Sequence, residues 1–359
     1  MADGDVRLVV SRPTIRIGGT DYPLLSDNIE RMRMREAVGG LSTLELAFTD
    51  WLSHDDGSAG YGATGGSPLQ LGARIKLYAG QQLGPQEIFD GMITALEGEV
   101  GTGAAPSFVI LAEDGLFKAR RTRKSRTFED QSPADIVNAI AGEIGLTPQV
   151  RGLSGPTRTW AQQNESDLAF LRRVLEEVDA DIQVVGDKLQ AGPLAKDKRE
   201  AVDLKLGATM IKARVTADLA DQATEVRVGS FDPQSGEEVS ESASTGELGP
   251  GAGKKGSEAL SAAMGDVREH IGTRQPMTAS EAQTIARTVF GRRARRFVRV
   301  EATSQGDARI RVGTWVTLSG LNPFFCNQYV VTEAVHRFDL ASGYITEFRA
   351  EGAFLGTPA

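Results

Sequence analysis

The chain is poor in the residues from which metal sites, disulfide frameworks and catalytic centres are commonly built. Its 359 residues include one cysteine, Cys326, which excludes an internal disulfide framework and any zinc site with several cysteines. The three histidines, His54, His270 and His336, show no HExxH or similar metal-binding spacing. His336 lies in an alternating strand pattern, which favours a structural role. We expect no catalytic residue, no cofactor-binding residue and no metal ligand.

Long apolar runs and phosphate-binding motifs are also missing. No stretch approaches the roughly 18 apolar residues of a membrane span, and the N-terminus lacks an apolar signal region. The glycine-rich segment 249–255 lacks P-loop spacing and a preceding apolar strand. With 48 acidic against 40 basic residues, the net charge of −8 argues against a dedicated nucleic-acid binder. We therefore expect no membrane insertion and no specific nucleic-acid binding.

The candidate catalytic side chains that remain fit simpler roles. The acidic pairs Glu176-Glu177 and Glu237-Glu238 could serve a glycosidase, which needs two carboxylates. Adjacent residues on a helix point in different directions, however, and such charges usually lie on a solvated face. Cys326 lies in an apolar turn, so we expect a buried, inert thiol rather than a nucleophile. The sequence predicts a protein that is not an enzyme.

What the chain does contain is many short strands. In residues 1–115, alternating apolar residues and glycine-rich turns predict an antiparallel sheet or small β-barrel with no helix between its strands. The Gly/Ser/Asp-rich stretch 55–67 is predicted to be a surface loop. The predicted strands cover residues 6–10, 15–17, 29–35, 41–48, 75–79, 87–93 and 108–111.

A mixed α+β unit is predicted for residues 116–204. Its first helix should begin after Ser132, which is suited to the N-cap, with Pro133 in the first helical position and Gly145 as the stop. The apolar stripe of this helix consists of Ile136, Ile140 and Ile144.

The stretch 160–182 belongs to the same unit and predicts a capped amphipathic helix that leads into a strand. Asn164 and Ser166 are suited to capping, and Glu165 and Asp167 would lie in the first turn, where the helix dipole favours negative charge. The residues after the helix, Asp181 to Val184, alternate polar and apolar as a half-buried strand does. The apolar stripe of the helix consists of Leu168, Phe170, Leu171, Val174, Leu175 and Val178.

The last part of the chain returns to strands around a polar segment. Residues 205–235 and 278–359 are predicted to form a second antiparallel barrel. Residues 236–277 are low in apolar content, so we expect a flexible insertion or crossover with a short helix at 258–267. The predicted strands cover residues 211–215, 223–231, 297–302, 315–318, 329–338 and 344–350.

A helix capped by Thr278 or Ser280 should precede the last strands and ends in an arginine cluster. Cations near the C-terminus of a helix interact favourably with its dipole. They could equally form a charged seam against an acidic neighbour, and the sequence leaves both interpretations open. The cluster consists of Arg292, Arg293, Arg295 and Arg296.

Several segments, in the right order along the chain, resemble the hub proteins of contractile tails. That family includes the phage late control gene D proteins and the hub-like N-terminal half of type VI secretion VgrG spike proteins. One departure is Asn327, where family members usually have glycine two residues before the tyrosine; asparagine tolerates left-handed backbone, so we expect the turn to be kept. The resembling segments are 112–116, 126–132, 164–177, 228–233, 306–321, 329–331 and 335–348.

The resemblance implies a fold and a function. Such hubs carry two antiparallel β-barrel domains of the tube type, here joined by a smaller α+β domain, and three chains form a ring with pseudo-sixfold symmetry. The ring joins a hexameric tail tube to a trimeric spike. In secretion-spike relatives the hub continues into a neck and a β-helical needle; neither follows here, so a separate spike protein is expected.

The partners implied by the resemblance are two further copies of the chain, the tail tube protein, the separate spike, other baseplate proteins, and a tape measure or cargo in the lumen. Assembly is expected in the bacterial cytoplasm, within a virion tail or a phage-tail-like particle. Phages, tailocins and contractile injection systems all fit. The alternatives from other classes are a tail-associated enzyme that degrades peptidoglycan or glycan, and a carbohydrate-binding β-protein.

Overall fold

The computed structural model describes residues 12–53, 59–62, 67–80, 84–103, 105–232, 234–272 and 276–356. The predicted strand at 6–10, His54 and much of the predicted loop 55–67 lie outside the described residues. Within that loop, residues 59–61 form the short strand β6 (Ala59–Tyr61), which pairs with β5 (Trp51–Ser53).

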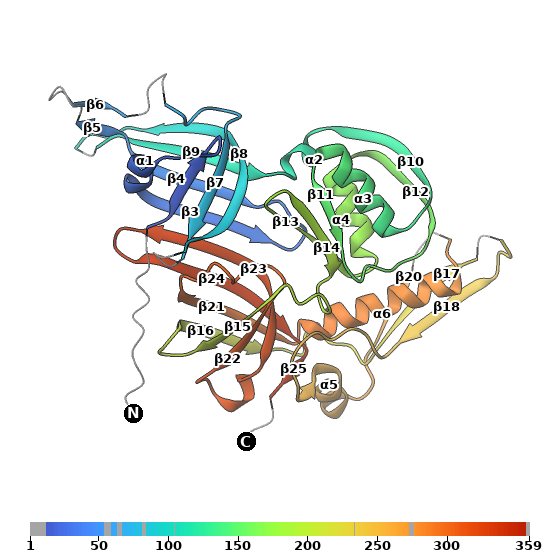
Figure 1. Ribbon diagram of the computed structural model, residues 1–359. Helices are drawn as coiled ribbons and strands as arrows, with labels where there is room; N and C mark the ends of the chain where they lie inside the picture. Colours follow the sequence, from blue (N-terminus) through green and yellow to red (C-terminus); the bar gives the residue numbers. More distant parts are fainter. Residues whose placement is uncertain are drawn as a thin grey trace.

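One large sheet of thirteen strands organises the chain (Figure 1). Its pairings are antiparallel except for β15 with β22, which is parallel. Strand β23 is the junction of the sheet, because it pairs with β24, β3 and β22. The order along the sheet is β16 (Met210–Ala217), β21 (Val298–Gln305), β24 (Gly343–Gly352), β23 (Gln328–Asp339), β3 (Ile29–Ala37), β4 (Thr43–Thr49), β9 (Ser107–Asp114), β8 (Gln86–Glu99), β7 (Arg74–Ala79), β1 (Thr14–Ile17) and β2 (Thr20–Asp21), with β15 (Glu200–Lys205) and β22 (Thr314–Ser319) branching from β23.

The sheet carries two hydrophobic cores, one for each half. The first is built from β1, β3, β4 and β7 to β9, and Met34, Leu46 and Ile75 are fully buried in it. The second is built from the strands after residue 200 and includes Tyr329 and Phe348. This distribution follows from strand geometry, because alternate side chains of each strand enter a core while the others face outward. Most predicted strands are therefore present, and the β-rich antiparallel class is confirmed.

A short helix interrupts the first half, against the prediction of strands alone. Helix α1 (Pro23–Asp27) follows β2 directly, and proline occupies its first turn. Proline is favourable at that place because its fixed φ suits a helix and its missing N–H is one that a helix leaves unpaired. The alternating pattern of the neighbouring strands hid this single turn of helix.

The middle unit lies beside both halves of the large sheet (Figure 1). It has its own core, around Trp160, Phe170 and Leu171. Helix α3 confirms its predicted limits: Ser132 accepts a hydrogen bond from the Asp135 N–H in a capping box, and Gly145 ends the helix at a φ of 78°. The elements are α2 (Phe117–Arg121), β10 (Arg123–Gln131), α3 (Pro133–Ile144), β11 (Thr147–Val150), β12 (Arg158–Ser166), α4 (Asp167–Glu176), β13 (Ala180–Val185) and β14 (Lys188–Pro193).

The stretch 160–182 differs from its prediction at both ends. Residues 158–166 form strand β12, paired with β10, so Asn164 and Glu165 precede the helix and Ser166 is its N-cap. Asp167 starts α4 but is buried against Lys124 and Arg126 of β10. Strand β13 is buried on both faces, not half-buried, because other parts of the chain cover its polar side.

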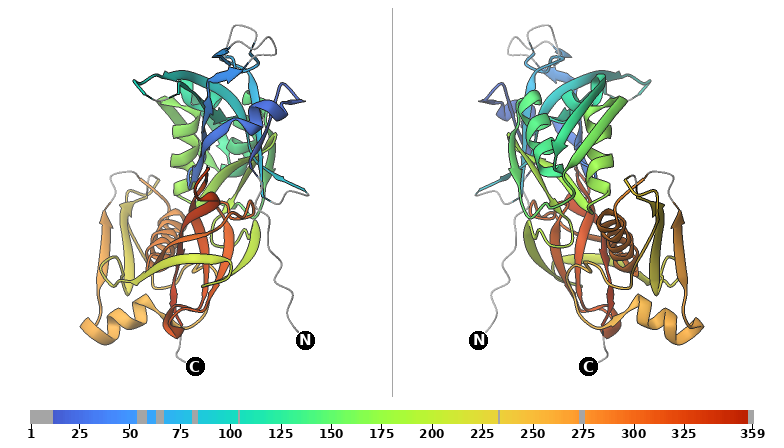
Figure 2. Two further views of the ribbon diagram at one scale, coloured as in Figure 1. Left: turned by 90° about the vertical axis from the view of Figure 1, so that its left-hand side faces the viewer. Right: turned by 90° about the vertical axis from the view of Figure 1, so that its right-hand side faces the viewer.

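An outlying unit contains most of the segment predicted to be a flexible insertion (Figure 2). Strand β17 (Glu225–Phe231), expected in the second barrel, lies in a separate sheet between β18 (Glu238–Ala243) and β20 (Arg268–Gly272). Helix α6 (Ala279–Arg295), capped by Thr278, packs on this sheet. A few well-spaced apolar residues, such as Val226, Val228 and Val239, are enough to bury one face, which low overall apolar content conceals.

The remaining elements complete this side of the molecule. Helix α5 (Gly256–Met264) begins two residues before its prediction, because Lys255 and Glu258 form the cap. Strand β19 (Lys254–Lys255) pairs with β25 (Phe354–Leu355), and the short helix η1 (Pro323–Phe325) precedes β23. The closure of the two barrels and the domain limits remain predictions.

Candidate assembly surface and interdomain junction

One face of the large sheet is open and charged across both halves. Because side chains alternate along a strand, each strand that buries one face in a core presents its other residues to this second face. We call it the charged face. Its charged members on the five strands from β16 to β3 are Lys212, Arg214, Arg299, Glu301, Glu347, Arg349, Glu351, Glu333, Arg337, Asp339, Arg31, Arg33 and Arg35.

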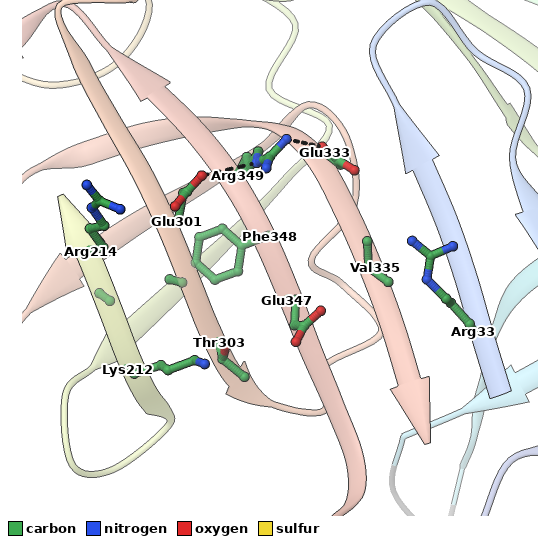
Figure 3. Close-up of a pocket in the computed structure, with 12 residues that line it drawn as sticks. Arg33, Lys212, Arg214, Glu301, Thr303, Glu333, Val335, Glu347, Phe348 and Arg349 are labelled. Atoms are coloured by element: carbon green, nitrogen blue, oxygen red, sulfur yellow. Dashed lines mark hydrogen bonds and ion pairs between the residues drawn. The ribbon is translucent and has the colours of Figure 1, made fainter. Parts of the chain in front are cut away.

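Ion pairs cross the centre of the charged face from strand to strand (Figure 3). Arg349 on β24 lies 3.4 Å from Glu301 on β21 and 3.2 Å from Glu333 on β23. Arg35 on β3 approaches the same Glu333 at 2.7 Å. Solvent-exposed pairs of this kind are each worth only about 0–1 kcal/mol. They therefore set the pattern of charge on the face more than they stabilise the fold.

Three cations at the margins of this pattern have no ion-pair partner among the described residues. Lys212 and Arg214 lie on β16, at the end of the sheet order. Arg33 on β3 stands directly opposite Arg337, and the carboxylate on its other side, Glu45, is paired with Arg31 instead. Like charges placed directly opposite are unfavourable. The face therefore carries surplus positive charge, although the chain as a whole has a net charge of −8.

A hollow of about 500 Å³ lies between these cations (Figure 3). Its floor includes Thr303 and Val335, whose side chains are short, and long charged side chains such as Lys212, Glu347 and Arg33 surround them. A depression therefore forms where small residues meet long ones. It offers charged and hydrogen-bonding groups for binding, and no pair of groups in it is arranged as a nucleophile with its base.

A buried carboxylate ties three parts of the chain together next to this face. Glu36, at the end of β3, is 3% exposed and accepts hydrogen bonds from Arg311 Nη2 at 2.6 Å and from the Val312 N–H at 2.6 Å. Gln183 of β13 donates at 3.1 Å to Oε1, the oxygen that also accepts from Val312, whereas Arg311 donates to Oε2. Burial would raise the pKa of Glu36, but Arg311 and these donors outweigh burial and lower the pKa. The first half, the middle unit and the second half thus meet at one charged group.

A second buried carboxylate lies beside the first. Asp181 of β13 accepts hydrogen bonds from the Gly39 N–H at 2.6 Å and from Arg199 Nη1 at 3.1 Å. Burial raises the pKa of Asp181, with Arg199 opposing. Gly40, at a φ of 71°, has no room for a side chain here, because a Cβ would lie 2.6 Å from Leu116. We call Glu36, Asp181, Arg199 and Arg311 the buried junction.

The arginine cluster at the end of α6 forms a charged seam against an acidic neighbour. Arg292 lies 2.8 Å from Glu176 of α4, and Arg295 lies 2.5 Å from Asp179 in the loop that follows. Arg293 pairs with Glu269 of β20. Of the two interpretations that the sequence left open, the seam is therefore present. It joins the outlying unit to the middle unit.

One prediction about a side chain near the C-terminus is wrong. Cys326 is exposed, not buried, because it follows η1 on the surface; its Sγ lies 3.4 Å from the Leu321 carbonyl oxygen. Asn327 is not among the described residues with positive φ, so left-handed backbone is not its role. Its side chain instead accepts from the Ala252 N–H at 3.1 Å and donates to the Ala252 carbonyl at 2.8 Å.

The remaining candidates are not brought together into one site. His336 is buried, with Nδ1 2.7 Å from the Tyr344 hydroxyl, and burial lowers its pKa to about 4. His270 is exposed on β20, and Glu237-Glu238 are exposed at the start of β18. Glu176 pairs with Arg292, whereas Glu177 pairs with Arg158 at 2.6 Å, so the two carboxylates serve different contacts.

Sequence analysis did not single out the four residues of the buried junction. Each is one charged residue among ordinary neighbours, and its partner lies outside its own element: Asp181 and Arg199 are 18 positions apart, and Glu36 and Arg311 are 275 positions apart. One signal existed, since Arg311 lies within 306–321, one of the segments that carry the resemblance. Asp114, in the segment 112–116, is similarly buried and accepts from the Ser42 N–H at 2.7 Å.

The described part of the chain contains neither a metal-binding cluster nor a membrane-spanning helix. No three His, Cys, Asp or Glu residues there are grouped so that they could hold a metal ion. No helix in the same residues is long and apolar enough to cross a membrane.

Solved structures with this fold are phage tail proteins and type VI secretion proteins. The 43 kDa tail protein of prophage MuSo2 from Shewanella oneidensis is 12% identical, with a TM-score of 0.69, and the match covers 94% of this chain and 97% of that one. A tail protein from Neisseria meningitidis is 9% identical, with a TM-score of 0.65 and coverage of 95% and 96%. The E. coli c3393 protein is 13% identical, with a TM-score of 0.61 and coverage of 96% and 79%; it is described as a type VI secretion component similar to the T4 tail proteins gp27 and gp5.

At the level of sequence, the type VI secretion spike protein VgrG1c of Pseudomonas aeruginosa is 24% identical over 167 residues. That match covers 45% of this chain and 22% of the relative, so it spans about a fifth of the relative's length. The resemblance to tail hubs and VgrG proteins is confirmed.

A family model covers nearly the whole chain. It is described as the Alg8 N-terminal domain and matches residues 12–339, which include the large sheet's central strands, the middle unit and the buried junction. The chain belongs to the Alg8 N-terminal domain family.

Proposed function

We propose that the chain is the baseplate hub of a contractile tail or contractile injection system. Three copies form a ring with pseudo-sixfold symmetry, which joins a hexameric tail tube to a separate trimeric spike and contacts other baseplate proteins. The observation that supports this most is the fold: tail proteins and a type VI secretion component match it over 94–96% of the chain. The particle assembles in the bacterial cytoplasm.

In this proposal the charged face lines the bore of the ring. The face runs over strands of both halves of the chain, and it is polar, as a surface facing an aqueous channel should be (Figure 3). A tape measure or cargo would lie against it. The two hydrophobic cores support two tube-type barrels, one within 1–115 and one formed by strands within 205–235 and 278–359. Residues 116–204 join them, and β17, α6 and the segment 236–277 form the outlying unit.

Closure of the ring would also cover the exposed edge of the large sheet. Strand β16 ends the sheet order, and its eight residues leave backbone donors and acceptors on one side without a neighbouring strand among the described residues. Exposed edges invite pairing with another chain. A closed ring of identical subunits satisfies each edge with its neighbour, which is how homo-oligomers commonly remove such edges.

Native mass spectrometry tests the proposal. We expect a species of three times the 38.4 kDa chain, alone or after addition of the tube and spike proteins produced from neighbouring genes. The same samples are assayed for clearing of purified peptidoglycan. A protein that remains monomeric with those partners and clears the cell-wall substrate would contradict the hub and favour the enzyme alternative.

A further inference from the structure

We propose that the hollow on the charged face binds an acidic, extended segment of a partner protein. The inference rests on the proposed function for its setting, because it names what the bore-facing sheet holds. It is carried by the three cations Arg33, Lys212 and Arg214, which lie at the hollow and have no ion-pair partner among the described residues.

The unpaired positive charges around the hollow lie at its two ends. Lys212 and Arg214 stand on β16, and Arg33 stands four strands away on β3. Between them the lining has three carboxylates, Glu301, Glu333 and Glu347, and one cation, Arg349, which pairs with the first two, so the centre carries no surplus positive charge. An occupant therefore gains most from negative charges at its ends and little from charge in its middle.

The spacing of these ends matches an extended peptide. Four strand spacings of about 4.8 Å, combined with a two-residue step of about 7 Å along the strands, separate Lys212 from Arg33 by about 20 Å. An extended chain advances about 3.3 Å per residue, so acidic residues six positions apart would reach both ends. Residues six apart also point to the same side of an extended chain, because the side-chain period is two.

The same charges disfavour a nucleic acid as the occupant. The lining includes Arg33, Lys212, Arg214 and Arg349, but also three carboxylates, Glu301, Glu333 and Glu347. A nucleic acid carries a negative charge at every nucleotide and would meet these carboxylates. A peptide can place acidic residues opposite the cations and neutral residues opposite the carboxylates.

The hollow continues along the sheet, which gives room for a segment and not only for a single side chain. A second hollow of about 440 Å³ shares Glu301 and Arg349 with the first and adds the cations Arg296 and Arg299 and the carboxylate Glu351. The volume of the first, about 500 Å³, falls within the roughly 300–1,000 Å³ of protein binding sites. The path leads from β16 toward the seam at the end of α6, where Arg296 also lines a hollow of about 670 Å³.

Fluorescence anisotropy with a defined probe tests the inference. The probe is a labelled seven-residue peptide with aspartate at the first and seventh positions and serine between, and unlabelled oligodeoxythymidine serves as competitor. Against it we compare the full-length protein, the triple variant Arg33→Ser/Lys212→Ser/Arg214→Ser, and the control Lys188→Ser/Lys254→Ser/Arg287→Ser. The control removes three exposed cations that also lack an ion pair among the described residues and do not line the hollow.

We expect the triple variant to bind the peptide about tenfold more weakly than the wild type, since three exposed charge contacts at about 0.5 kcal/mol each give roughly that factor. The control should bind within twofold of the wild type. Equal binding by all three proteins would overturn the inference, and so would displacement of the peptide by a lower concentration of oligodeoxythymidine than of unlabelled peptide.

Native mass spectra of the same samples distinguish a failure of the peptide-binding inference from a failure of the proposed hub function. A trimer that does not bind the peptide would support the proposed function and contradict the inference. A monomer that binds the peptide through these three cations would keep the binding site and reject the ring.

Discussion

His336 is a histidine held without charge inside the fold. It is 0% exposed, its Nδ1 contacts the hydroxyls of Tyr344 and Thr346 on β24, and Glu36, Arg311 and Asp307 are the charged groups near it. Burial lowers its pKa to about 4, because the charged imidazolium would lose its water there.

This histidine should make the fold sensitive to mild acid. The unfolded chain binds the proton near pH 6.5 and the native chain only near pH 4, so the unfolded state holds more protons between these values and stability falls as the pH drops through them. Between pH 7.5 and pH 5 this group should lower the free energy of unfolding by about 2 kcal/mol. Urea denaturation at the two pH values measures it.

The matched variants for this measurement are His336→Gln and His270→Gln. His336→Gln should remove most of the contribution of this group to the difference in the free energy of unfolding between the two pH values, whatever the substitution does to stability at pH 7.5. The second replaces an exposed histidine and should keep the wild-type difference. If both variants show the wild-type difference, His336 is not the group responsible.

At the scale of elements, α6 shows how one helix can use its arginines in two ways. The side chain of Arg295 is 4% exposed and contacts Asp179 and, at 2.7 Å, the carbonyl oxygen of Glu247. The side chain of Arg292 is 30% exposed, and its partner Glu176 is 68% exposed. Both lie in the last turn, where the dipole favours cations, so only their burial differs.

Burial should decide the cost of removing each arginine. Arg295→Ala leaves Asp179 without its partner in a largely buried place, and we expect a loss of about 3 kcal/mol in the free energy of unfolding. Arg292→Ala breaks an exposed pair and should cost less than about 1 kcal/mol. Chemical denaturation at neutral pH compares them. Equal losses would mean that the seam is solvated and does not lock α6 to the middle unit.

The helices also show which local signals were readable from sequence. The predicted limits of α3 were correct, because Ser132, Asp135 and Gly145 act within their own turn of chain. For α4 the sequence suggested two caps, Asn164 and Ser166, and Ser166 is the N-cap, because residues 160–165 are held in β12 by pairing with β10, which lies some 35 positions earlier. The local sequence is compatible with either start of the helix, and pairing with a strand distant in the sequence determines which one occurs.

At the scale of the whole molecule, β23 makes the two halves one structure. Its residues 333–339 pair with β3, and the same segment pairs with β24, so a strand of the first half is continuous with the sheet of the second. The buried junction lies next to this pairing, because Glu36 is at the end of β3. A break in β23 should therefore affect both halves at once.

Calorimetry tests this continuity. The wild-type chain should unfold in one transition over both halves. Val335→Pro removes a backbone donor from the centre of the sheet and should lower the melting temperature by about 4 °C or more, or prevent folding, because a loss of about 3 kcal/mol acts against the unfolding entropy of the whole 359-residue chain. The same change at Thr216, on β16 at the end of the sheet, should cost clearly less. Two separate wild-type transitions would contradict the continuity.

The sequence by itself determined the β-rich class, most strands, the caps of α3 and α6, and the resemblance to tail hubs. All of these depend on residues close together in the chain, through side-chain alternation, capping and short motifs. Tertiary structure alone decided that β17 leaves the large sheet, that β13 is buried on both faces, and that Cys326 is exposed. It also decided the buried junction and the unpaired cations of the charged face, because whether a charge finds a partner depends on strands that meet only after the chain has folded.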